Sequence, residues 1–171
     1  VTRLYAVYES FVGRLLVAWL GKLPLLYPAY SDLPDAVRNA HRTGVAHILQ
    51  RHGSASAFKS LSELQIIDGL HSGLSKRAFA LLVDAFQIET RNYFWEPLKG
   101  VLSNAGIEDV DQLVTTNQEL SDFIDAQLGG QSTPASELNS LVTYRNVAAH
   151  DEVVEIISPE KMLQTITFFR H

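Results

Sequence analysis

Residues 141–150 read LVTYRNVAAH, an apolar segment at helical spacing that carries an Arg-Asn pair and ends in a histidine. Arg145 and Asn146 are adjacent, His150 follows the arginine by five residues, and the chain turns acidic directly afterwards. Residues five apart on a regular helix differ by about 140° in direction. Arg145 and His150 therefore share a face only if the helix ends or bends near Ala149.

A second copy of the same spacing occurs earlier, where Arg42 is followed five residues later by His47. Chance alone allows about one such match in a chain of this length and composition. The two copies differ in context, because Gly44 lies inside the earlier one and no Asn follows its arginine. The later copy, in which Asn146 follows Arg145, is the stronger candidate for a functional site.

Apolar residues recur at helical spacing along most of the chain, and prolines, glycines and capping residues separate the apolar runs. Pro97 predicts a kink or a late start in its helix, and Gly106 is expected just after the end of that helix. The segment 75–86 is read as helix or partly extended chain, and 24–34, 53–62 and 131–135 as loops. The predicted helices cover Leu4–Leu20, Asp35–Arg51, Thr90–Asn104, Asp109–Leu128, Ser136–Ala149 and Ser158 to the chain end.

The chain is long and apolar enough for one globular domain over residues 1–171, since 46% of its residues are hydrophobic. The helical pattern predicts an all-α fold, with the Arg-His motif at the end of a late helix. Val1 stands where a Met would begin a complete chain, and the helical pattern starts almost at once. The sequence is therefore expected to lack its true N-terminus.

The motif resembles the Arg-x(4–6)-His signature of the HEPN superfamily (higher eukaryote and prokaryote nucleotide-binding), many of whose members are metal-independent endoribonucleases. Residues 4–12 resemble the first helix of a bacterial HEPN branch, with an aromatic and a Glu before a bulky apolar residue. Residues 98–107 resemble the helix-Gly-Ile step before the motif helix. Asp151 departs from the family, where Gly commonly follows the motif histidine. The resemblance implies an up-and-down helical bundle that dimerises and builds one composite cleft from two motif copies.

The residue types at the motif suit RNA cleavage by attack of the ribose 2′-OH on the adjacent phosphorus. His150 is the candidate acid or base because an unperturbed imidazole titrates near working pH. Arg145 is the candidate phosphate clamp, and Asn146 is predicted to hold phosphate or orient the site. Glu9 and Tyr144 are candidate supporting residues. The structural alternatives are an internal Arg145–Glu9 ion pair, a His150 that caps its helix, and a Tyr144 that belongs to the core.

The net charge of −5 argues against a broad surface for long nucleic acid, which usually needs a basic face. Any RNA contact is then local. Arg38 and Arg42 lie four residues apart, share a helix face, and are expected either to be solvated or to contact RNA at the rim of the cleft. The aromatic run 93–95 is expected in the core rather than as a base-stacking platform.

The chain contains no cysteine, so disulfides and thiolate metal sites are excluded, which fits a reducing compartment such as the cytoplasm. His41, His47 and His52 are six and five residues apart, which does not place them on one helix face, so no metal and no cofactor is expected. No stretch is long and apolar enough to predict a membrane span.

The resemblance thus predicts an endoribonuclease that acts on RNA as a homodimer, in a toxin or antiphage role, with an antitoxin or another regulatory protein as a further partner. Two other classes remain open from the sequence. One is a catalytically silent HEPN module for dimerisation or partner docking, and the other is a nucleotide-binding accessory domain. The acidic net charge favours these two, whereas the intact Arg145, Asn146 and His150 favour the enzyme.

Overall fold

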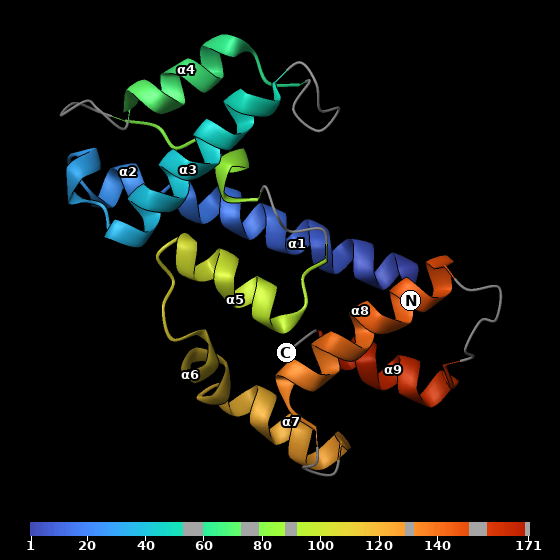
Figure 1. Cartoon of the computed structure of the whole chain (residues 1–171). Coiled ribbons are helices and arrows are strands. Elements are labelled where there is room, and N and C mark those ends of the chain that lie inside the picture. The colour runs from blue at the N-terminus through green and yellow to red at the C-terminus, as the bar shows by residue number, and fades with distance from the viewer. Residues whose placement is uncertain (53–59, 73–78, 88–91, 129–131, 151–156, 170–171) are drawn as a thin grey trace. The chain divides into compact units, whose positions relative to one another are not determined.

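The computed structural model describes residues 1–52, 60–72, 79–87, 92–128, 132–150 and 157–169, with the side chains of Ser72 and His150 left out. Within these ranges the chain is helical and contains no strand, so the all-α prediction is confirmed. Two short 3₁₀ helices, η1 (Tyr30–Asp32) and η3 (Val83–Phe86), join the α-helices. These are α1 (Thr2–Leu20), α2 (Leu23–Leu26), α3 (Asp35–Arg51), α4 (Glu63–Ser72), α5 (Trp95–Asn104), α6 (Val110–Thr115), α7 (Gln118–Leu128), α8 (Pro134–His150) and α9 (Pro159–Phe168) (Figure 1).

The chain forms two compact units. Unit 1 contains residues 1–12, 92–99 and 109–171, and unit 2 contains residues 13–91 and 100–108. Helices α1 and α5 each contribute residues to both units. The motif residues lie in unit 1, and the second copy of the pattern lies in unit 2. The prediction of a single domain over the whole chain stays a prediction.

Helix α5 starts at Trp95, five residues later than Thr90, as Pro97 had led us to expect. Pro97 occupies the third helical position, where its missing N–H needs no partner within the helix. The Asn139 side chain accepts a hydrogen bond from the Trp95 backbone N–H at 2.8 Å, which satisfies one of the donors exposed by the helix start. The late start therefore has a local cause in Pro97 and a tertiary one in Asn139.

The C-terminus of α5 ends where the sequence predicts, with Gly106 just beyond it in a left-handed conformation of φ 82°. Gly106 N–H bonds the Ser103 carbonyl and Ile107 N–H bonds the Leu102 carbonyl, each at 2.9 Å, which is the Schellman arrangement. A side chain at Gly106 would be strained by this φ and would also meet Val37 at 2.9 Å.

The single helix predicted over 109–128 is wrong, because two helices, α6 and α7, occupy it. The Thr115 and Thr116 hydroxyls bond carbonyls of the preceding turn, which favours an end there. Asn117 then caps the next helix, since its side-chain oxygen accepts from Leu120 N–H at 3.1 Å. The apolar residues keep their helical spacing across the break between α6 and α7, so the sequence pattern predicted one continuous helix.

Helix α4 was not predicted, although it carries a start signal. Ser62 and Gln65 form a capping box, in which Ser62 Oγ accepts from Gln65 N–H and Gln65 Oε1 accepts from Ser62 N–H. Gly69 lowers the helix propensity of this segment. In the structure Gly69 is buried, and a Cβ added there would lie 3.4 Å from the Val45 side chain of α3. This distance is an ordinary van der Waals contact, so the packing of α4 on α3 does not itself require a glycine.

The segment 75–86 was predicted as helix or partly extended chain, and its first part, like most of the predicted loop 53–62, lies outside the described residues. The described remainder contains only the 3₁₀ turn η3, which packs on α3. The loop 24–34 contains the short elements α2 and η1. No described helix has both the length and the apolar character needed to cross a bilayer.

Candidate functional site

The motif helix α8 begins at Pro134, two residues before the predicted start. Thr133 Oγ1 accepts from Ser136 N–H at 3.1 Å and Ser136 Oγ accepts from Thr133 N–H at 2.8 Å, so the two side chains cap the helix reciprocally. Leu141 and Val142 are completely buried and anchor the helix one turn before the motif. The start of the helix is thus set by local caps and its orientation by apolar burial.

A buried ion pair also holds this helix in unit 1. Glu137, only 4% exposed, receives two hydrogen bonds from Lys161 Nζ of α9, at 2.9 and 3.1 Å. Ser132 Oγ donates a third hydrogen bond, at 2.8 Å, to the same carboxylate. The carboxylate is therefore well satisfied by its partners, as a buried charge must be.

The Arg145 guanidinium is half-buried and lies over the ring of Tyr5, 5.0 Å from the ring centroid. Its Nη1 donates a hydrogen bond to Asn146 Oδ1 at 2.9 Å. Among the described residues, no carboxylate forms an ion pair with Arg145. The structure therefore does not have the alternative internal Arg145–Glu9 ion pair, and within the described residues Asn146 is the side chain to which Arg145 donates a hydrogen bond.

Glu9 is exposed on α1, but it acts electrostatically on the same tyrosine as Arg145 does. The pKa of the Tyr5 hydroxyl is raised, mainly by burial and then by the negative charge of Glu9. The Tyr93 backbone and the positive charge of Arg145 partly oppose this rise. Glu9 and Arg145 thus both act on the Tyr5 hydroxyl without pairing with each other, and a supporting role for Glu9 stays a prediction.

Tyr5 is a site residue that the sequence pattern did not single out. It is 2% exposed and packs edge-on against Tyr8, with ring centroids 6.1 Å apart. Tyr8 donates from its hydroxyl to the Tyr93 carbonyl at 3.0 Å, and burial raises its pKa above the ordinary range. The available signal was an aromatic pair three residues apart on the first helix, a spacing that is also typical of a core. Its position under Arg145 depends on the tertiary fold.

His150 is the last residue of α8, and its side chain lies outside the described part of the structure. The helix continues through Ala149 without a break, so the positions of Arg145 and His150 differ by about 140° around its axis. No bend occurs through Ala149, and α8 ends at His150, one residue after the position where an end was expected. Tyr144 is half-buried, which leaves its predicted supporting role untested.

The second copy of the pattern is part of the packing of unit 2. Gly44, between Arg42 and His47, is buried so tightly that a Cβ would lie 2.0 Å from the Ala85 carbonyl oxygen. Arg42 is exposed and donates to Asn39 Oδ1 at 3.0 Å, whereas His47 is half-buried. The close approach of η3 to α3 explains why this copy contains a glycine.

Arg38 and Arg42, the predicted RNA-binding pair, lie on α3 of unit 2. Arg38 is half-buried and is already engaged in an ion pair with Asp35 one turn earlier. Arg42 is exposed and therefore the more accessible of the two. A role for either in binding RNA stays a prediction.

Of the three histidines considered as metal ligands, His41 is fully buried, with both ring nitrogens in hydrogen bonds to protein groups. Throughout the part of the chain that the structure describes, no group of three or more His, Asp or Glu side chains is arranged to hold a metal ion.

A family model described as HEPN_MAE_28990-like HEPN matches residues 1–167. The comparison with curated proteins and the comparison with solved structures each found no match. The family match covers almost the whole chain, including the motif in α8 and the first helix that supplies Tyr5 and Glu9. The all-α architecture described above agrees with it. The chain therefore belongs to the HEPN_MAE_28990-like HEPN family.

Proposed function

We propose that the chain is a metal-independent endoribonuclease whose active site is built around Arg145, Asn146 and His150. The observation that carries this proposal is the half-buried Arg145 guanidinium, which rests on Tyr5 and has no carboxylate partner among the described residues. Such a guanidinium suits a phosphate, which accepts two parallel hydrogen bonds from it. Membership of the HEPN family supports a function in RNA or nucleotide chemistry.

The proposed reaction is attack of a ribose 2′ oxygen on the adjacent phosphorus. The 2′ O–H proton passes to a base, the P–O5′ bond breaks, and an acid supplies the proton that the 5′ oxygen takes up. The products end in a 2′,3′-cyclic phosphate and a 5′-OH. Arg145 neutralises the charge that develops on the phosphorane oxygens, His150 transfers protons, and Asn146 orients Arg145 through the hydrogen bond between them.

The position of His150 relative to Arg145 favours a site shared between two copies of the chain. Positions about 140° apart on one helix do not face the same point, whereas a two-fold axis beside α8 brings Arg145 of one copy toward His150 of the other. The proposed enzyme is therefore a homodimer with a composite cleft. In the cell it acts as a toxin or antiphage effector in the cytoplasm, under the control of an antitoxin or another regulatory protein.

The decisive experiment measures RNA cleavage in excess EDTA by the wild-type protein and by Arg145→Ala and His150→Ala. Each substitution is expected to lower the rate by about 10²–10⁴-fold, because each removes a charge-stabilising or proton-transfer group. Circular dichroism should show unchanged folding. A folded His150→Ala protein with full activity, products that end in 3′-OH, or a strict Mg²⁺ requirement would refute the proposed mechanism.

The second copy of the pattern supplies the matched control. His47→Ala changes the corresponding histidine of that copy and should leave the cleavage rate near the wild-type value. Arg42→Ala and Arg38→Ala are expected to raise KM for RNA with little change in kcat if these arginines contact the substrate. Loss of cleavage in His47→Ala, with activity retained in His150→Ala, would place the active site at the second copy instead.

A catalytically silent HEPN module for dimerisation or docking is the second candidate. The uninterrupted helix favours it, because positions 145 and 150 of one copy differ by about 140° around the helix axis. A wild-type protein that cleaves no RNA, yet dimerises, would support this candidate. Binding of nucleotides without cleavage would instead support the nucleotide-binding accessory domain.

A further inference from the structure

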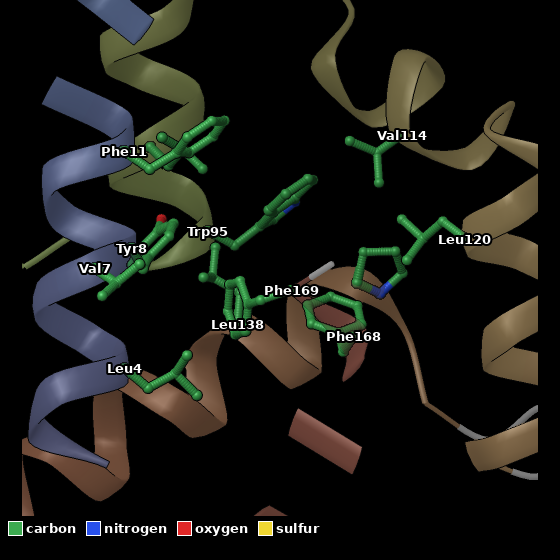
Figure 2. A pocket seen from close by; sticks show the side chains of 12 residues that line it. Leu4, Val7, Tyr8, Phe11, Trp95, Val114, Leu120, Leu138, Phe168 and Phe169 are labelled. Carbon is green, nitrogen blue, oxygen red and sulfur yellow. The ribbon is translucent and has the colours of Figure 1, made fainter. Parts of the chain in front are cut away.

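Unit 1 contains an open, apolar cavity of about 520 Å³ that the ribonuclease proposal does not use. Its walls come from α1, α5, α6, α7, α8 and the C-terminal end of α9, and they include Phe11, Trp95, Leu120 and Phe168. Figure 2 shows the α1 side chains on one side of the cavity and Val114 and Leu120 on the other. A volume of this size accepts several apolar side chains.

The polar atoms of the lining side chains are already in use. The Tyr8 hydroxyl donates to the Tyr93 carbonyl at 3.0 Å, and the Trp95 indole N–H donates to Asp111 Oδ1 at 2.9 Å. The other lining side chains are Leu, Val, Phe and Pro, which offer no hydrogen bond. A small-molecule site needs a few polar groups that orient its ligand. The cavity therefore suits inserted apolar side chains better than a small polar ligand.

The α1 wall of the cavity is exposed to solvent. Val7 is 66% exposed and Phe11 is 61% exposed, and the two lie four residues apart on one helix face. Both line the cavity, so its apolar surface continues onto an accessible rim. Contiguous exposed apolar surface of this kind marks sites of protein association.

The wall opposite α1 is acidic. From Gly100 to Tyr144 the chain contains no Lys and no Arg, and α6 and α7 carry only negative charges. Asp111 lies at the cavity, where its carboxylate accepts from the indole of Trp95 and is paired with Lys99 at 2.8 Å, so the negative charge that acts on a partner comes from α7. Glu119 precedes the lining residue Leu120, and Glu119 and Asp122 are exposed one turn apart on α7. The surroundings would repel the phosphates of RNA and attract a positively charged partner.

We propose that this cavity is the docking site for a basic amphipathic helix of a protein partner. The apolar face of such a helix places side chains at i, i+3, i+4 and i+7 into the groove, and its Lys and Arg residues face α7. The complementary charges raise the association rate and select against acidic partners. This docking site does not depend on the ribonuclease proposal, and Arg145 is not among the residues that line it.

The test uses three fluorescein-labelled synthetic peptides and fluorescence anisotropy. The first peptide is a Leu/Lys amphipathic helix, the second has the same leucines with Glu for Lys, and the third keeps the lysines with Ser for Leu. The wild-type protein is expected to bind the Leu/Lys peptide at least about tenfold more tightly than either of the others. Equal binding of all three, or of the Leu/Lys and Leu/Glu peptides, would overturn the proposal.

Three variants locate the binding on the protein. Phe11→Asp and Val7→Asp each place a charge on the exposed rim, where folding tolerates it. Each substitution should lower the affinity for the Leu/Lys peptide by about tenfold. The double charge reversal Glu119→Lys with Asp122→Lys should lower the affinity for this peptide by a similar factor, and the affinity should then depend less on salt concentration. Leu163→Asp is the matched control, because Leu163 is 66% exposed on α9 and does not line the cavity, so the peptide affinity should be unchanged.

Three results would assign the cavity to another occupant or to none. Unchanged peptide affinity in both Phe11→Asp and Val7→Asp would show that the peptide binds elsewhere. Conversion of a dimer to a monomer by these two variants, measured by light scattering, would make a second copy of the chain the occupant. Binding of a labelled single-stranded RNA oligonucleotide to the wild-type protein that is lost in both Phe11→Asp and Val7→Asp would make nucleic acid the occupant.

Discussion

At the scale of single residues, the described neighbours of Arg145 leave its positive charge without a carboxylate partner. A cation over an aromatic ring gains about 0.5–2 kcal/mol, depending on burial, and the Tyr5 ring supplies this without neutralising the charge. Asn146 takes one N–H donor of the guanidinium. An Asp or Glu in place of either neighbour would hold Arg145 more strongly but would compete with phosphate for it.

His41 shows the opposite case, a titratable residue held in its neutral form by the core of unit 2. Leu82 N–H donates to His41 Nε2 at 3.0 Å, so the proton lies on Nδ1, which donates to the Tyr30 hydroxyl at 3.1 Å. Tyr30 in turn donates to the Arg38 carbonyl at 3.1 Å. Phe86 stacks on the imidazole. Burial lowers the pKa of His41 from 6.5 to about 4.

This lowered pKa predicts a loss of stability in acid. Between pH 6.5 and about 4 the unfolded chain takes up a proton on His41 that the folded chain does not, so the free energy of unfolding falls as the pH falls. The total loss is about 3 kcal/mol, from roughly 1.4 kcal/mol for each unit of pKa difference. Urea unfolding at a series of pH values from neutral down to the folded-state pKa measures it.

The variant His41→Gln should unfold with a smaller pH dependence than the wild type over this interval, whatever its stability at neutral pH. His71→Gln is the matched substitution at an exposed histidine of α4, and the smaller pH dependence is expected of His41→Gln relative to it. An NMR titration that places the pKa of the His41 imidazole in the folded protein near its ordinary value would contradict the prediction.

At the scale of elements, the packing of η3 on α3 requires a surface without side chains at Gly44. A Cβ at this position would lie 2.0 Å from the Ala85 carbonyl oxygen and 2.8 Å from the Ala85 Cα, and backbone atoms cannot move aside as the end of a side chain can. The helix tolerates the lower propensity of glycine here because the close approach buries Ala85 and Phe86.

Gly44→Ala is therefore expected to lower the free energy of unfolding by about 2–3 kcal/mol, because the packed segment must shift. Gly100→Ala is the matched substitution in α5, where a Cβ would meet no atom within 4 Å. It should raise the free energy of unfolding by about 0.5–1 kcal/mol through helix propensity alone. Denaturant unfolding of both variants measures the contrast, and equal effects of the two substitutions would contradict the proposed packing.

At the scale of the whole molecule, the proposed composite site makes a prediction about mixtures of inactive variants. Arg145→Ala and His150→Ala homodimers should each be inactive. After mixing and exchange of subunits, about half of the dimers contain one copy of each variant and thus one intact arginine and one intact histidine. RNA cleavage by the mixture should then exceed that of either variant alone.

Two measurements test this assembly. Cleavage assays follow the recovery of activity with time after mixing, at the rate at which subunits exchange. Light scattering gives the oligomeric state at the concentration of the assay. A fully active monomer, or a mixture of verified heterodimers with no activity above that of its components, would refute the composite site.

The helices could be predicted from the sequence where their ends depend on nearby residues. Pro97, Gly106 and Ser158 act within one turn through a missing N–H, a left-handed φ and a side-chain cap, so α5 and α9 end or begin where expected. Asn117 carried the same kind of signal, but the continuous hydrophobic spacing concealed it. The prediction of an all-α fold with the motif in a late helix depended on such local patterns, and the HEPN assignment depended on the resemblance of the motif and its flanking segments to the family. Both are confirmed.

The surroundings of the candidate site depended on contacts between residues distant in the sequence. Tyr5 lies under Arg145, and Ala85 covers Gly44, only because folding brings separate helices together. Periodicity shows which face of a helix is buried, but it does not identify the residue that covers it. The sequence by itself thus determined the helical class and the candidate motif, whereas the tertiary structure decided that Arg145 rests on an aromatic ring and forms no ion pair with Glu9.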